Sequence, residues 1–139
     1  MVDPFIGTWM CTGTSTTNET KPTTMTTMQS NMAKVVITAN GVNTGAVIVV
    51  RTPEDDATPR SCTEPGKLGS GDMTVTLDTP LMCPTASATI VETIDSSTLT
   101  LGANGNTYTG MSTYTLSGTT TAGKPYAATG TSSSTCTKM

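Results

Sequence analysis

Threonine makes up about a quarter of this chain of 139 residues, and it recurs at every second position through several stretches, as in Thr12-Gly13-Thr14. β-Branched residues favour the pleated sheet, and alternation with a period of two is typical of strands with one buried and one exposed face. The sequence therefore predicts an all-β protein. The length fits a single domain, residues 1–139.

Turn residues divide the alternating stretches into about nine strands. Glycine, asparagine and proline cluster between them, and no stretch has the apolar spacing of a helix. We expect strands over residues 5–17, 23–30, 33–38, 44–52, 73–77, 86–91, 98–101, 106–117 and 125–138. This spacing predicts an antiparallel up-and-down order of eight to ten strands.

Small and aromatic residues alternate on the predicted inner faces of the terminal strands. Examples are Gly7 and Trp9 near the start, Tyr108 and Gly110 later, and Tyr126 in the last strand. Glycines allow a sheet to coil, and alternating small and large side chains fill a tapering interior. We therefore predict one closed antiparallel barrel, with a β-sandwich as the alternative.

The four cysteines, Cys11, Cys62, Cys83 and Cys136, are far apart in the sequence. Structural zinc sites bring their ligands in close pairs, so disulfides are the better interpretation and no metal is expected. Barrel closure would place the first strand beside the last, which favours Cys11–Cys136 with Cys62–Cys83, although the other two connectivities remain open. Disulfides indicate an extracellular or cell-surface location, with a leader removed beforehand.

Composition argues against several functional classes. The chain has no histidine, so it lacks the commonest general base and imidazole metal ligand, and we expect neither an enzyme nor a cofactor. A net charge of -3 and few aromatic residues do not suit nucleic-acid binding. No apolar run reaches transmembrane length.

The Gly7-x-Trp9 pair at the start of the first strand resembles the opening motif of lipocalins and other calycins. The mid-chain motif of that family and its late basic residue over the tryptophan are not recognisable in the sequence. More diffusely, the beginning, the cysteine-containing segments and the Gly130-Thr131-Ser132 ending resemble threonine-rich secreted domains of uncharacterised function from myxobacteria. The lipocalin resemblance implies an internal cavity for a small apolar molecule, with Trp9 at its closed end.

Five residues are candidates for contact with such a ligand: Trp9, Tyr108, Tyr114, Tyr126 and Met73. The simpler interpretation of Trp9 is a core residue. An extracellular structural, surface or self-associating protein with a filled interior is the alternative function.

Four further features have plain interpretations. We expect the methionines Met25, Met28, Met32, Met73, Met82 and Met111 to fill the core rather than a promiscuous pocket, although the phase of Met111 within its strand points outward. Glu92 has the phase of an inward residue, but we expect a strand-end carboxylate that reaches water. The acidic run Glu54-Asp55-Asp56 is expected to be a solvated loop rather than a calcium site. Outward threonine ranks are expected to serve strand formation rather than ice binding.

Overall fold

The computed structural model describes residues 4–54, 60–69, 71 and 73–139. The regular elements within these ranges are nine strands: β1 (Gly7–Lys21), β2 (Met25–Ala39), β3 (Ala46–Pro53), β4 (Cys62–Leu68), β5 (Thr74–Leu77), β6 (Leu81–Pro84), β7 (Ile90–Leu101), β8 (Thr107–Thr119) and β9 (Pro125–Lys138). None of the described residues belongs to a helix with the length and hydropathy needed to cross a membrane.

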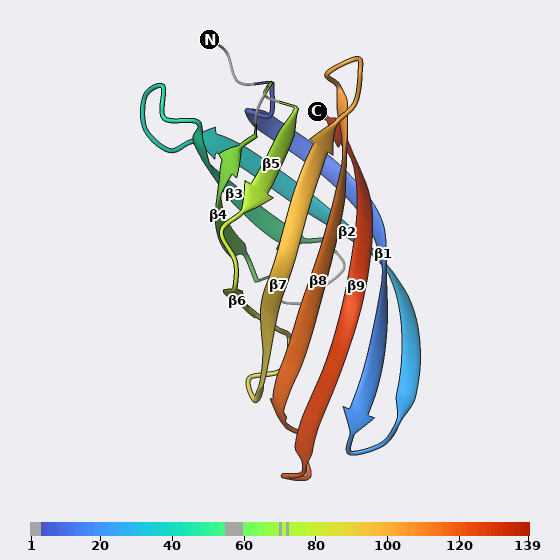
Figure 1. Ribbon diagram of the computed structural model, residues 1–139. Coiled ribbons are helices and arrows are strands. Elements are labelled where there is room, and N and C mark those ends of the chain that lie inside the picture. The colour runs from blue at the N-terminus through green and yellow to red at the C-terminus, as the bar shows by residue number, and fades with distance from the viewer. Residues whose placement is uncertain (1–3, 55–59, 70, 72) are drawn as a thin grey trace.

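The strands form a closed antiparallel up-and-down barrel, as predicted (Figure 1). Strands that follow one another in sequence pair, except β5 and β6; β1 also pairs with β9, and β5 pairs with β7 to complete the ring. The ring has eight positions because β5 and β6 share one. β5 pairs with the last part of β7 and β6 with its first part. This closure excludes the β-sandwich alternative.

Several strand boundaries differ from the prediction, although the strand number agrees. Residues 23–30 and 33–38 were expected to form two strands, but β2 runs through both because β1 pairs with it from Gly7↔Ile37 to Glu19↔Met25. Residues 86–91 and 98–101 were likewise expected to form two strands, but a single strand, β7, begins at Ile90 and runs to Leu101. The Thr85 hydroxyl binds the carbonyls of Ser87 and Ile90, which makes a local turn there instead of a strand.

Two strands were missed. Strand β4 contains Pro65, a residue that argues against a strand when only the sequence is available. Pro65 fits because its carbonyl still accepts the amide of Asp78 at 2.8 Å, while β4 pairs with both β3 and β5. Strand β6 has only four residues, too few for a period to be seen.

The interior divides into a closed half and an open half. In the closed half, at the upper end of Figure 1, all eight positions of the ring are filled. In the open half, β2 is no longer paired with β3. Residues 25–31 of β2 pair with β1 on one side, and no strand among the described residues pairs with them on the other. Those residues are exposed, and the lower hairpins β1–β2 and β8–β9 extend beyond the rest of the barrel.

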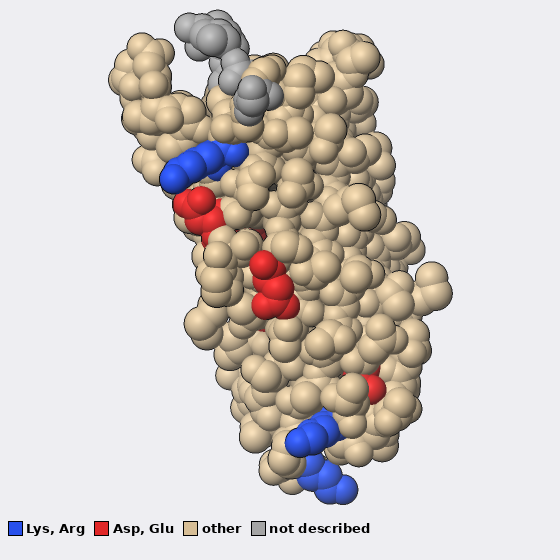
Figure 2. Space-filling view, in the orientation of Figure 1, with Lys and Arg blue, Asp and Glu red and all other residues tan. Residues whose placement is uncertain are grey.

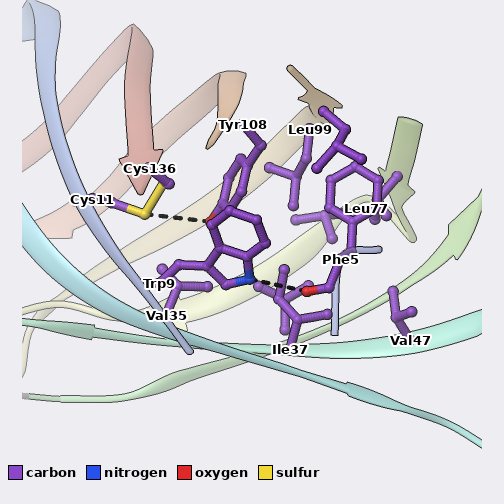
Figure 3. Packing of buried hydrophobic residues seen from close by; sticks show 13 residues of the cluster. Phe5, Trp9, Cys11, Val35, Ile37, Val47, Leu77, Leu99, Tyr108 and Cys136 are labelled. Carbon is purple, nitrogen blue, oxygen red and sulfur yellow. Dashed lines mark hydrogen bonds between the residues drawn. A yellow bond between two sulfur atoms is a disulfide. The ribbon is translucent and has the colours of Figure 1, made fainter. Parts of the chain in front are cut away.

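An apolar cluster fills the closed half (Figure 3). Trp9 and Phe5 are fully buried, and the Trp9 indole NH donates to the Phe5 carbonyl at 2.9 Å. The Tyr108 ring meets the Trp9 ring edge-on at 4.8 Å between centroids. Aromatic pairs of this kind stabilise beyond the area that they bury. Trp9 therefore closes this end of the barrel.

A basic residue from the last strand, Lys138, lies over Trp9. Its ammonium lies 5.1 Å from the centroid of the Trp9 ring and donates to the Pro4 carbonyl at 3.3 Å. A cation over an indole face is attracted by the ring quadrupole. With this contact, the closed end is compatible with a calycin-like barrel.

Both predicted disulfides are formed, and no described cysteine is free. Cys11 and Cys136 are direct partners across β1 and β9, so this bridge joins the first strand to the last. The Tyr108 hydroxyl lies 3.3 Å from the Cys11 sulfur. Cys62–Cys83 links β4 to β6. One bridge therefore fixes the pairing of the first strand with the last, and the other joins two strands that do not pair with each other.

The expectation that the methionines fill the core is wrong. All six are exposed, from 43% for Met73 to 77% for Met28, because their strands turn these positions outward or because they lie beyond the closed half. Met111 points outward as its phase predicts.

The outward residues of β8 and β9, and of β1 as far as Thr20, include no charged side chain. Most are threonine or serine, such as Thr12, Thr109 and Thr135, and we call this surface the hydroxyl face. In Figure 2 the charged side chains gather along one side and at the lower end, while the upper area over β8 and β9 has none.

Candidate ligand-binding site

Three charged side chains point into the barrel where the closed half meets the open half. Arg51 follows Val47 and Val49 on the inner face of β3, Glu64 follows Cys62 on β4, and Glu92 comes from β7. Two Arg51 nitrogens donate to the same Glu64 oxygen, Nη2 at 3.1 Å and Nε at 3.3 Å. Arg51 Nη2 also lies 3.7 Å from a Glu92 oxygen. One guanidinium thus faces two carboxylates.

Burial and charge set the protonation of this cluster. Glu64 is almost fully buried, and this burial raises the pKa of its carboxyl although the charge and hydrogen bonds of Arg51 act to lower it. Burial would lower the pKa of Arg51, but the two carboxylates outweigh it and raise that pKa. Arg51 therefore stays charged, and its ion pairs hold two acids at the floor of the open half.

The Cys62–Cys83 disulfide lies directly beside the charged cluster. Cys83 is the direct cross-strand partner of Glu92, and Cys62 is that of Arg51. The Cys83 sulfur lies 3.9 Å from Glu64 Oε1 and 4.0 Å from Arg51 Nη2. Cys62, Glu64 and Cys83 together have three possible metal-ligand atoms within 4.8 Å of one another. However, both sulfurs are in the disulfide, and metal coordination requires thiolates.

Hydroxyl groups line the wall opposite the charged cluster. The Tyr114 and Thr17 hydroxyls are 2.6 Å apart, and Ser112 and Ser132 form a second pair across β8 and β9. The Tyr114 ring lies directly over Gly130, its cross-strand partner, where a Cβ atom would be only 2.3 Å from the ring. Glycine at this position is what lets the tyrosine lie flat against the wall.

A cavity of about 560 Å³ occupies this region. The three charged residues border it on one side, and Ser97, Ser112 and Ser132 on the other. Apolar side chains, among them Val49, Ile94 and Leu116, complete the lining. Its volume is within the range of small-molecule sites, and its lining combines apolar surface with a few polar groups.

The structure brings together only part of the predicted ligand set. Tyr108 and Tyr114 border the cavity. Trp9 instead belongs to the apolar cluster of the closed half. Tyr126 is partly buried near Glu19, and burial, with a smaller contribution from Glu19, raises the pKa of its phenol. Met73 is 43% exposed just before β5, outside the barrel interior.

The charged cluster was not predicted. Glu92 was expected to reach water, but its side chain is only 24% exposed and pairs with Arg51. Arg51 and Glu64 were not identified at all. A signal was available, because Arg51 continues the inward phase of Val47 and Val49. The acidic run was expected to be a solvated loop: Glu54 is exposed as expected, while Asp55 and Asp56 lie outside the described residues.

No model of a known protein family matches this chain, and a search of curated proteins finds no match either. The resemblance to lipocalins and to threonine-rich secreted domains therefore stays a prediction. What the structure shows is an antiparallel closed barrel compatible with a calycin-like fold, with a charged cluster facing a cavity.

Proposed function

We propose that this protein is a non-catalytic extracellular binding protein that takes one small amphipathic molecule into the open half of its barrel. The polar group of the ligand meets the Arg51–Glu64–Glu92 cluster. Its apolar part lies against Val49, Ile94 and Leu116. The sequence predicted an apolar ligand, and the polar lining of the cavity changes that expectation to an amphipathic one.

The charged cluster is the observation that carries this proposal. Placing charges inside a barrel costs free energy that an apolar core would not cost, so an interior ion network needs a reason. The contrast within this protein is clear, because the outward hydroxyl face on β1, β8 and β9 has no charge while the interior has three charged groups. Charged groups that converge on a cavity are typical of functional sites, and two of these groups, Arg51 and Glu64, have a raised pKa.

The two disulfides support an extracellular location, because such bonds persist in oxidising compartments. The absence of histidine supports a binding role rather than catalysis, since the commonest general acid and base is missing from the sequence.

A nuclear magnetic resonance titration tests the binding proposal. Small amphipathic compounds with cationic, neutral or anionic polar groups are added to isotope-labelled protein. We expect saturable one-to-one shifts at Ser97, Ser112 and Ser132. Ser132→Phe fills the cavity from inside and should abolish the shifts, whereas Thr131→Phe, on the outer face of the same strand, should leave them unchanged. Shifts confined to the hydroxyl face, or none with folded protein, would reject the proposal.

A structural or surface role is the second candidate, and the hydroxyl face favours it. Three adjacent long strands with uncharged outward side chains offer a large surface for copies of the chain or for another partner. Sedimentation of the purified protein over a wide concentration range separates the two candidates. Self-association that is lost when Thr109 and Thr135 are replaced by lysine would favour the structural role.

A further inference from the structure

The charged cluster of Arg51, Glu64 and Glu92 has more acidic than basic groups. Arg51 brings one positive charge, while Glu64 and Glu92 bring two carboxyl groups. Arg60 also borders the cavity, but its guanidinium donates to the Thr85 carbonyl at the rim and makes no ion pair with either acid. The cluster therefore presents an excess of acceptor groups to a ligand.

The acids also retain hydrogen-bonding capacity. An ionised carboxylate has about four acceptor positions on its two oxygens. Both Arg51 hydrogen bonds go to Oε1 of Glu64, and Oε2 receives none from the described residues. Glu92 lies 3.7 Å from Arg51, beyond hydrogen-bond distance, and is 24% exposed. Glu92 can accept a donor from the cavity without losing a hydrogen bond.

An anionic ligand fits this arrangement poorly. The positive charge of Arg51 is already shared by two acids, so an added carboxylate or phosphate would meet two like charges at short range. A positively charged donor instead gains charge-assisted hydrogen bonds to Glu92 and Glu64. The neighbouring hydroxyls of Ser97 and Ser112 can serve as further acceptors.

We propose that the ligand is a small organic cation, an amine with a short apolar body, whose ammonium group binds Glu92 and the second oxygen of Glu64. This inference rests on the proposed binding function and specifies its ligand class. The apolar body occupies the part of the cavity next to Ile94, Leu116 and Val49. Its ammonium group completes the cluster with equal numbers of positive and negative charges.

The test compares hexylamine, hexanol and hexanoate, which share a chain length and differ in the charge of the polar group. Calorimetry and magnetic resonance titration at neutral pH should show one-to-one binding of hexylamine and weaker or no binding of the other two. Glu92→Gln should weaken hexylamine binding by about tenfold or more, as expected for loss of a charge-assisted hydrogen bond. Circular dichroism confirms that the variant is folded.

Asp95→Asn is the matched control. Asp95 lies three residues from Glu92 on the same strand, but it faces outward and accepts a hydrogen bond from Thr115 at 2.6 Å. This variant changes the net charge as Glu92→Gln does and should bind hexylamine like the unaltered protein. An equal loss in both variants would show that general electrostatics, rather than the Glu92 site, attracts the amine, and would overturn the inference.

The remaining outcomes separate the inference from the function on which it rests. Binding of hexanol or hexanoate in the cavity without hexylamine overturns the amine class and leaves the binding function in place. If none of the three compounds binds the folded protein, and the wider titration finds no ligand either, both the amine inference and the binding function are rejected. Calcium chloride alone is the last arm: calcium binding that Glu92→Gln removes, with no amine binding, would assign the acids to a metal instead.

Discussion

At the scale of single residues, Trp9 shows how one side chain closes an end of the barrel. Its ring is fully buried, it donates to the Phe5 carbonyl, and the Lys138 ammonium lies over it. It also contacts the Tyr108 ring, which approaches the Cys11 sulfur. Loss of the indole would therefore remove contacts with β8, β9 and the entry segment at once.

Trp9→Ala should lower the free energy of unfolding by about 3–5 kcal/mol, because the closed half cannot collapse around the void. Guanidinium unfolding followed by far-ultraviolet circular dichroism measures the change without needing the tryptophan signal. Met111→Ala is the control, and it should change stability by less than about 0.5 kcal/mol because this side chain is 70% exposed. Equal effects of the two substitutions would contradict the assignment of Trp9 to the core.

Glu64 should give the folded protein a pH dependence that is unusual for an acid. Burial raises the pKa of this carboxyl above its ordinary value of 4.5, so the folded state keeps a proton that the unfolded state has lost. Stability then falls, rather than rises, as the pH increases from the ordinary value through the raised one. Glu64→Gln should remove this contribution.

Thermal unfolding between about pH 4 and pH 8 measures the effect. The difference in unfolding free energy between Glu64→Gln and the unaltered protein should move in favour of the variant as the pH rises. Glu54→Gln, which changes an exposed side chain at the end of β3, supplies the comparison. Parallel profiles for Glu64→Gln and the unaltered protein would show that burial does not govern this carboxyl.

At the scale of strands, β7 joins the two halves of the barrel. Its last residues pair with β5 and close the ring, while its first residues pair with β6 and bring Glu92 beside Cys83. A register shift between Ile94 and Ser96 separates the two parts. β-Bulges of this kind re-aim side chains, and here Glu92 and Ser97 both face inward on either side of the shift.

Replacing Cys62 and Cys83 together by serine should lower the free energy of unfolding by about 3 kcal/mol under the chain-entropy model for a short loop. Their separation is 21 residues, against 125 for Cys11 and Cys136. The corresponding double substitution of Cys11 and Cys136 should therefore cost more, about 5 kcal/mol by the same model. Denaturant titrations of both double variants test the order, and a larger loss from the shorter loop would contradict it.

At the scale of the whole molecule, the two halves of the interior differ because only one of them is enclosed. Where eight positions surround the interior, side chains such as Ile37, Val47 and Val75 lose contact with water and the lining is apolar. Where residues 25–31 of β2 have no second neighbour among the described strands, hydroxyl and charged groups join apolar side chains in the lining. Side-chain polarity follows exposure, as expected from the cost of unpaired buried polar groups.

Hydrogen exchange should distinguish the two halves within one strand. In β2, the amides that are hydrogen-bonded in residues 33–37, between β1 and β3, should exchange at least about tenfold more slowly than those bonded only to β1 in residues 25–31. Mass spectrometry of peptic peptides or magnetic resonance can follow both segments. Equal protection along β2 would mean that the open half is covered in solution.

The sequence by itself determined the properties that depend on neighbouring residues. Strand propensity and a period of two predicted the all-β fold, the inward positions of Trp9, Cys11 and Tyr108, and the outward position of Met111. Barrel closure, inferred from glycine and aromatic positions, was enough to favour both disulfide pairings. Each of these follows from local geometry, because successive side chains on a strand must point to opposite faces.

Only the tertiary structure decided what depends on pairing between distant segments. Pro65 lies in a strand because β3 and β5 flank it, and the methionines are exposed because the ring leaves their positions outside or uncovered. Arg51, Glu64 and Glu92 meet because two registers and a disulfide agree. The β3–β4 register pairs Arg51 with Cys62, the β6–β7 register pairs Glu92 with Cys83, and the bridge joins the two cysteines. A register sets contacts across dozens of residues, and a one-residue slip would turn each of these side chains to the other face.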